Sequence, residues 1–102
     1  MNVKLGNAAV RYKITQEELQ KLLKQEALKE KIGPGKSEFT IKIQPCDNKK
    51  QAEINFERHS LVLYLPKANI KELFDMGRSK EGLRFKQEEV SLQIQVDIRP
   101  EK

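Results

Sequence analysis

The sequence has few of the residues that build disulfides, metal sites and aromatic binding surfaces. It contains one cysteine, one histidine and no tryptophan. The single cysteine, Cys46, cannot form an intramolecular disulfide, which favours a reducing compartment. With His59 as the only histidine, the usual zinc ligand sets cannot be assembled within one chain. We therefore expect no metal site, no cofactor and a cytoplasmic location.

Long apolar runs are also missing. The longest, Leu61 to Leu65, is far shorter than the roughly 18 residues that a membrane-spanning helix needs. The N-terminus has no signal-peptide pattern, so we expect a soluble protein with no membrane partner. The 102 residues amount to 11.9 kDa, and domains typically have about 100–150 residues. Residues 1–102 are therefore expected to form one domain.

The charge balance is basic, with 20 Lys and Arg against 15 Asp and Glu, a net charge of +5. Such a balance favours an acidic partner such as nucleic acid. Most of the cations are lysines, however, whereas base reading and bidentate phosphate contacts favour arginine. Charge alone thus indicates a Lys-rich surface, with nucleic acid as an alternative partner.

The first third of the chain predicts a hairpin, a helix and a strand. Alternating apolar residues flank Gly6-Asn7 and predict a hairpin over residues 2–14, whose opposite face would carry Lys4, Arg11 and Lys13. Thr15 and Glu18 have the capping-box spacing, so a helix should begin there. We favour its end near Gln25, with a short strand before the turn at 33–37, although residues 26–32 also fit a helix.

The rest of the chain alternates further strands with one helix. Strands are expected at 39–44, 52–57, 61–65, 83–86 and 90–98, and the strand at 61–65 is apolar on both faces, which is typical of a central position. A helix should begin near Asn69, or one or two residues earlier, and end at Gly77. We see no internal repeat in the sequence.

These elements predict the α+β class, with an antiparallel sheet that has both helices packed on one face and the other face solvated. The open face would carry a mixture of charges and amides, namely Arg11, Lys13, Thr40, Lys42, Glu53, Asn55, Glu57, Gln93, Gln95, Asp97 and Arg99. The aromatic residues Tyr12, Phe39, Phe56 and Phe85 follow the aliphatic register and should belong to the core. Tyr64 is then the one aromatic candidate for the open face.

No convergent catalytic set emerges from the sequence. Cys46 and His59 could meet only across a hairpin, with no third residue to orient the imidazole. Glu53 and Glu57 lie about 13 Å apart along one strand, so they cannot by themselves act as a paired acid and base, and a carboxylate from a neighbouring strand, such as Asp97, would be needed. We expect such charges to pair across strands instead, and we expect no enzymatic activity.

Nucleic acid could bind through phosphate contacts alone, at Lys49-Lys50 and at Arg78, Lys80, Arg84 and Lys86. The candidate ligand-binding residues are the basic side chains of the second strand and of the region around the 78–86 loop and strand: Arg11, Lys13, Arg78, Lys80, Arg84 and Lys86. Such contacts set the position of a nucleic acid but carry no sequence information.

The run from Gly6 to Leu19, GNAAVRYKITQEEL, resembles a family of small uncharacterised bacterial proteins. Those proteins open with a strand, Gly-Asn, a small residue, a basic alternating strand, then Ser or Thr and a helix. The later order of elements is also similar, including Leu63-Tyr64-Leu65-Pro66 before the second helix. The family's acidic, Lys, Asp, Phe run and terminal Cys are replaced here by Val96-Asp97-Ile98-Arg99-Pro100. The resemblance implies a bacterial domain of unknown function and transfers no site.

The sequence thus favours a non-catalytic binding or protein-interaction domain. A protein partner or self-association is the leading expectation. The alternative is a sequence-nonspecific nucleic-acid-binding protein, which requires the basic residues to gather on one surface away from the acids. A small enzyme that uses Glu53, Glu57 or Asp97 with Arg11 is a third hypothesis, and it requires a concave pocket where they converge.

Overall fold

A computed structural model of the chain describes residues 1–33, 39–76 and 82–96. These residues form two helices and eight strands, which places the fold in the α+β class. The order is β1 (Asn2–Gly6), β2 (Ala9–Ile14), α1 (Gln16–Leu23), β3 (Leu28–Ile32), β4 (Phe39–Cys46), β5 (Glu53–Glu57), β6 (Ser60–Pro66), α2 (Lys67–Met76), β7 (Leu83–Gln87) and β8 (Val90–Val96).

The strands form two four-stranded mixed sheets and not the single antiparallel sheet that the sequence predicted. Sheet A has the order β1-β2-β8-β7 and sheet B the order β3-β4-β6-β5. In each sheet two antiparallel hairpins join through a parallel central pair, β2 with β8 and β4 with β6. The prediction was wrong because alternation along a strand identifies hairpins but does not show which hairpins pair with each other.

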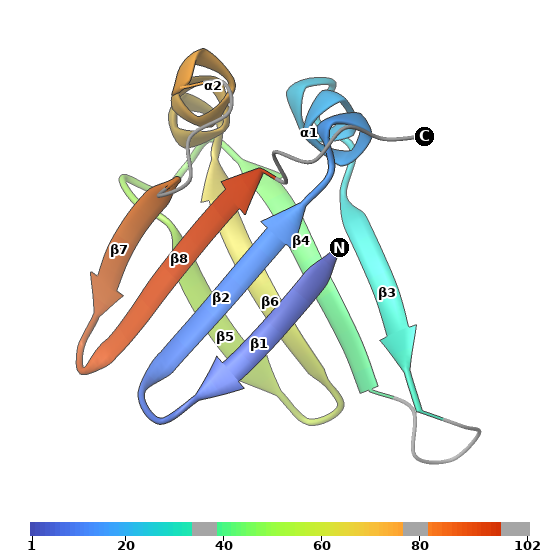
Figure 1. Cartoon of the computed structure of the whole chain (residues 1–102), viewed down its shortest axis with the longest axis vertical. Helices are drawn as coiled ribbons and strands as arrows, with labels where there is room; N and C mark the ends of the chain where they lie inside the picture. Colours follow the sequence, from blue (N-terminus) through green and yellow to red (C-terminus); the bar gives the residue numbers. More distant parts are fainter. Residues whose placement is uncertain (34–38, 77–81, 97–102) are drawn as a thin grey trace.

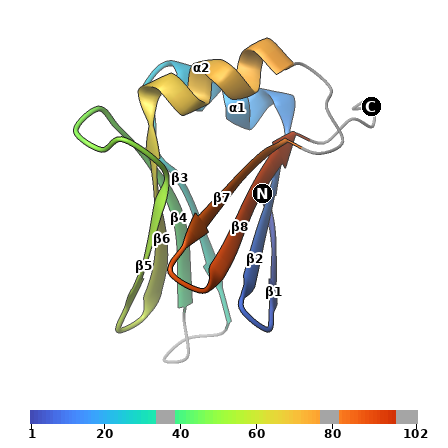
Figure 2. The same cartoon turned by 90° about the vertical axis from the view of Figure 1, so that its left-hand side faces the viewer.

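Both helices lie across the same end of the two sheets, which face each other (Figures 1 and 2). The core between them takes buried side chains from the inner faces of both sheets and from both helices. Tyr12, Leu22, Ile43, Leu63 and Ile94 are among its fully buried members. No described helix is long and apolar enough to cross a membrane.

Several local predictions are confirmed. Thr15 accepts a hydrogen bond from the backbone N–H of Glu18, whose carboxylate accepts one from the N–H of Thr15, so α1 starts with a capping box. Residues 28–32 are strand β3. β6 is a central strand in which Leu61, Val62 and Leu63 are all buried. The end of α2 expected at Gly77 lies outside the described residues.

Two details differ from expectation. In the first hairpin Gly6 pairs with Ala9, so the turn residues are Asn7-Ala8, and the positive φ of 55° falls on Ala8. The Phe56 side chain is 64% exposed, although its position in the strand pattern indicated a core residue. Phe56 lies near the end of β5. The alternation of apolar and polar residues continues to this end of the strand, but the buried core does not extend that far.

The chain contains a structural repeat that was not visible in the sequence. The order hairpin, helix, hairpin occurs twice, and each sheet combines one hairpin from each half of the chain. Buried positions recur 51 residues apart, as for Val10 and Leu61, Ile14 and Leu65, and Ile43 and Ile94. The two halves share the pattern of apolar positions and the pairing of strands, but few identical residues. The outer faces of the two sheets can therefore differ in charge.

Candidate functional site: a basic face on sheet A

The charged side chains at the described outward positions of sheet A are all basic. Val10, Tyr12, Leu92 and Ile94 of its central strands are buried against sheet B, so the alternate residues point away from the core. These outward positions include the five cations Lys4, Arg11, Lys13, Arg84 and Lys86, which we call the basic face. Figure 1 presents this sheet nearest to the viewer.

The register of the strands aligns three of these cations in one row. Lys4 pairs with Arg11, Arg11 with Gln93, and Gln93 with Arg84. Neighbouring strands are about 4.8 Å apart, so the row crosses all four strands over about 14 Å. Lys13 is one pleat along the strand from Arg11, on the side of the helices.

The acids that the structure describes lie away from the centre of this surface. Among the described residues of β1, β2, β7 and β8, no outward position is Asp or Glu. Glu88 and Glu89 occupy the turn between β7 and β8, at the end of the sheet and beyond Lys86. The centre of the basic face is therefore the row through Arg11, where charges of the same sign lie close together.

Two shallow depressions mark the surface on either side of Arg11. One, of about 190 Å³, is lined by Asn2, Lys4, Arg11, Lys13 and Gln95. The other, of about 240 Å³, has Arg11 and Arg84 among its lining residues, together with Ser91 and Gln93. Guanidinium, ammonium and amide N–H groups in such positions can donate hydrogen bonds to phosphate oxygens.

The outer face of sheet B is different. Its cations Lys29, Lys31 and Lys42 share the surface with Glu53 and Glu57. Glu57 accepts a hydrogen bond from the Ser60 hydroxyl at 3.3 Å. This mixed surface contains Glu53 and Glu57 of the predicted open face, whereas Arg11, Lys13, Gln93 and Gln95 lie on sheet A and Asp97 lies outside the described residues. The prediction of one mixed-charge face was wrong because the strands belong to two sheets.

Tyr64 does lie on the outer face of sheet B, where it is half-buried. The Lys49 ammonium sits 5.3 Å from the centre of the Tyr64 ring, within the range of a cation–π contact. Lys49 also forms an ion pair with Glu53. Its hydrogen bond to Glu53 raises the pKa of Lys49. The ring therefore has a cation over it in the folded chain, and Lys49 would have to move before a base could stack at that position.

The residues of the catalytic hypotheses are not brought together. β4 runs parallel to β6, with Thr40 opposite Ser60 and Cys46 opposite Pro66, so Cys46 and His59 belong to opposite ends of this strand pair. Burial raises the pKa of the Cys46 thiol, which disfavours the nucleophilic thiolate. Glu53 and Glu57 lie on sheet B, whereas Arg11 lies on sheet A.

Within the described residues, no cluster of three or more His, Cys, Asp and Glu side chains is placed to hold a metal ion. Of the six candidate ligand-binding residues, four share the basic face: Arg11, Lys13, Arg84 and Lys86. Arg78 and Lys80 lie outside the described residues, as do Asp97 and Arg99. The row also contains Lys4, which was not among the ligand-binding candidates. Its position between the apolar residues Val3 and Leu5 indicated that its side chain faces outward.

Comparison with known proteins gives a family but no function. Residues 1–99 match the model of DUF7009, described as a family of unknown function. No curated protein and no solved structure matches the chain.

Proposed function

We propose that the chain, which belongs to the DUF7009 family of unknown function, is a non-catalytic binding protein that holds the phosphate backbone of nucleic acid. The observation that carries this proposal is the segregation of charge among the described residues: five cations lie on the outer face of sheet A, and none of its described outward strand positions is Asp or Glu. Neutralising phosphates with Lys and Arg releases counterions, and this term supplies essentially all of nonspecific binding.

The proposed binding does not depend on base sequence. Direct base reading needs side chains that enter a groove, and recognition of single strands uses exposed aromatic rings. The described outward positions of sheet A hold no aromatic residue, and Tyr64 lies on the other sheet with the Lys49 ammonium over its ring. A broad basic surface without these features suits contacts to phosphate alone. A cytoplasmic location, expected from the single cysteine, would give access to nucleic acid.

The test is the binding of a fluorescein-labelled 20-base-pair duplex, measured by anisotropy between about 50 and about 200 mM salt. If all five cations contact phosphates, the slope of log K against log salt should be about −4.5. Two duplexes of unrelated sequence should bind equally. The double variant Arg11→Gln and Arg84→Gln should reduce the steepness of the slope by about 2 and weaken binding roughly tenfold at the same salt.

A matched variant separates the basic face from net charge. Lys29→Gln and Lys42→Gln remove the same charge from the outer face of sheet B and should change the affinity less than twofold. Equal weakening by the two double variants would contradict a site on sheet A. Absence of binding at the lowest salt would contradict the function itself. A protein partner or self-association, expected from the sequence, stays a prediction.

A further inference from the structure

A second candidate site lies between the helices and shares no residue with the basic face. It is a cavity of about 690 Å³ lined by Leu23, Gln25, Lys67, Ala68, Ile70, Lys71, Phe74 and Asp75, which we call the helix pocket. Sites for small molecules commonly have about 300–1,000 Å³, mostly apolar walls and a few polar groups that fix orientation. The helix pocket has this composition.

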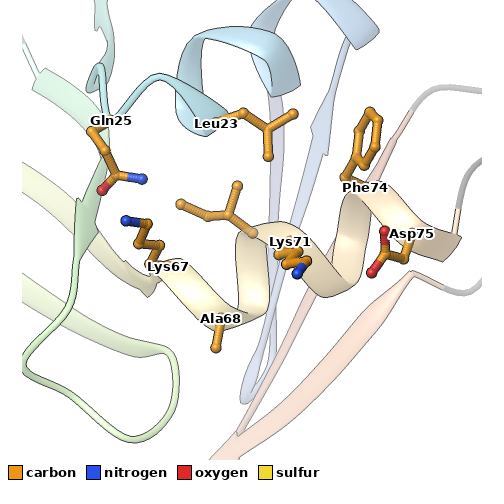
Figure 3. A pocket seen from close by; sticks show the side chains of 8 residues that line it. Leu23, Gln25, Lys67, Ala68, Lys71, Phe74 and Asp75 are labelled. Carbon is orange, nitrogen blue, oxygen red and sulfur yellow. The ribbon is translucent and has the colours of Figure 1, made fainter.

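The polar groups of the helix pocket are arranged by charge. Figure 3 shows Gln25 and Lys67 pointing toward one another at one end, while Leu23 projects from α1 toward α2 and Phe74 stands at the other end. Lys71, one helical turn after Lys67, also lines the cavity. The carboxylate of Asp75 lies beside Phe74, so it disfavours an anion at that end. A ligand with one anionic group is therefore oriented toward Lys67 and Gln25.

The backbone at Gln25 is unusual and places its side chain. The N–H of Glu26 donates to the Lys21 carbonyl at 2.9 Å and the N–H of Gln25 donates to the Leu22 carbonyl at 2.9 Å, which is the Schellman pattern at the end of α1. This pattern needs a left-handed residue, usually glycine, and here Gln25 adopts it with a φ of 67°. Glycine would adopt this φ without strain, but it would place no side-chain amide at the helix pocket.

The apolar surface of the helix pocket is exposed in the isolated chain. Ile70 is buried beneath it, whereas the Phe74 side chain is 48% exposed. An apolar chain seated there would remove apolar surface of Phe74 and Leu23 from water, which is favourable in proportion to the area buried. A free carboxylate would supply the charge that Lys67 and Lys71 attract.

We propose that the helix pocket binds a small carboxylate with an aliphatic chain, its carboxylate between Lys67 and Gln25 and its chain against Leu23, Ile70 and Phe74. The probe is decanoate at concentrations below those at which it forms micelles. Because the sequence has no tryptophan, Phe74→Trp places a unique fluorophore at the pocket, and Met76→Trp places one on the same helix outside its lining. Met76 is 40% exposed, so both substitutions are at partly exposed positions.

Decanoate should change the tryptophan emission of the Phe74→Trp variant in a saturable way, with a midpoint of about 10–100 µM, and should leave that of the Met76→Trp variant unchanged. Decanol and decyltrimethylammonium, which lack the anion, should bind at least tenfold more weakly. Isothermal titration of the unsubstituted chain should give the same midpoint and one site. An absent signal in both measurements, equal affinity for decanol, or an equal response in the Met76→Trp variant would each overturn the proposal.

Two further variants test the polar end. Lys67→Gln should remove the preference for decanoate over decanol, whereas Lys21→Gln, an exposed lysine of α1 outside the lining, should keep it. Gln25→Gly should raise the unfolding midpoint because glycine relieves the strain, and it should also weaken decanoate binding. If Gln25→Gly binds decanoate as tightly as the unsubstituted chain, the Gln25 amide does not contact the ligand. If Lys67→Gln keeps the preference for decanoate over decanol, the proposed position of the carboxylate is wrong.

Discussion

Tyr12 illustrates a residue whose hydroxyl group the fold does not satisfy. The side chain is fully buried in the core, and its hydroxyl has no hydrogen-bond partner among the described residues. Burial raises the pKa of Tyr12 far above its ordinary value of 10.0. A buried hydroxyl without a partner costs about 1–3 kcal/mol, so the ring stabilises the core while the oxygen opposes it.

Tyr12→Phe should therefore raise the free energy of unfolding by about 1 kcal/mol, measured by urea denaturation. The raised pKa also gives a pH dependence. In the unfolded chain this phenol ionises near 10.0, and the folded chain resists ionisation, so stability from this group is present below that pH and lost as pH rises above it. The variant should lose less stability above pH 10 than the native chain. A destabilised variant would show that the hydroxyl has a hydrogen-bond partner, and equal alkaline losses would show that burial does not raise its pKa.

At the scale of the elements, Gln87 joins the two sheets at their edges. Its side-chain oxygen accepts a hydrogen bond from the Ile54 N–H at 2.7 Å, and its amide nitrogen donates to the Ile54 carbonyl at 3.0 Å. β7 is an edge strand of sheet A and β5 an edge strand of sheet B. One side chain thus satisfies both backbone groups that β5 presents at this residue, as a neighbouring strand would.

Gln87→Ala should lower the free energy of unfolding by about 2 kcal/mol, because two hydrogen bonds of about 1 kcal/mol each are lost at a buried residue. Amide exchange at Ile54 should become faster, since its N–H loses its acceptor. Gln95→Ala, on the outer face of sheet A, is the control and should change stability by less than about 0.5 kcal/mol. Unchanged exchange at Ile54 in Gln87→Ala would contradict the role of this side chain.

Local features of the elements could be predicted from the sequence, whereas pairing between distant hairpins could not. The capping box at Thr15 and Glu18 depends on residues three apart, and strand alternation depends on neighbours two apart. The parallel pairing of Arg11 with Gln93 joins residues far apart in the chain, and no local pattern specifies it. The alternation within β2 identified Arg11 and Lys13 as candidates. It could not show that they lie on a different sheet from Glu53 and Glu57, because that depends on which hairpins pair.

At the scale of the whole molecule, the exchange of hairpins between the two halves ties their stabilities together. β2 of the first half pairs with β8 of the second, and β4 of the first half pairs with β6 of the second. Side chains from both sheets and both helices form one cluster of buried residues. Neither half contains a complete sheet, so neither can unfold while the other keeps its central pairing.

We expect a single cooperative unfolding transition, and the two tyrosines allow each sheet to be followed separately. Tyr12 lies on β2 of sheet A and Tyr64 on β6 of sheet B, and the chain has no tryptophan to obscure their fluorescence. In Tyr64→Phe the remaining tyrosine reports on sheet A, and in Tyr12→Phe it reports on sheet B.

Within each variant, urea transitions followed by tyrosine fluorescence and by far-ultraviolet circular dichroism should have the same midpoint and slope. A fluorescence midpoint that precedes the dichroism midpoint in either variant would mean that one sheet unfolds first. The exchange of hairpins makes that outcome unfavourable, because the sheet left behind would expose its inner apolar face to water.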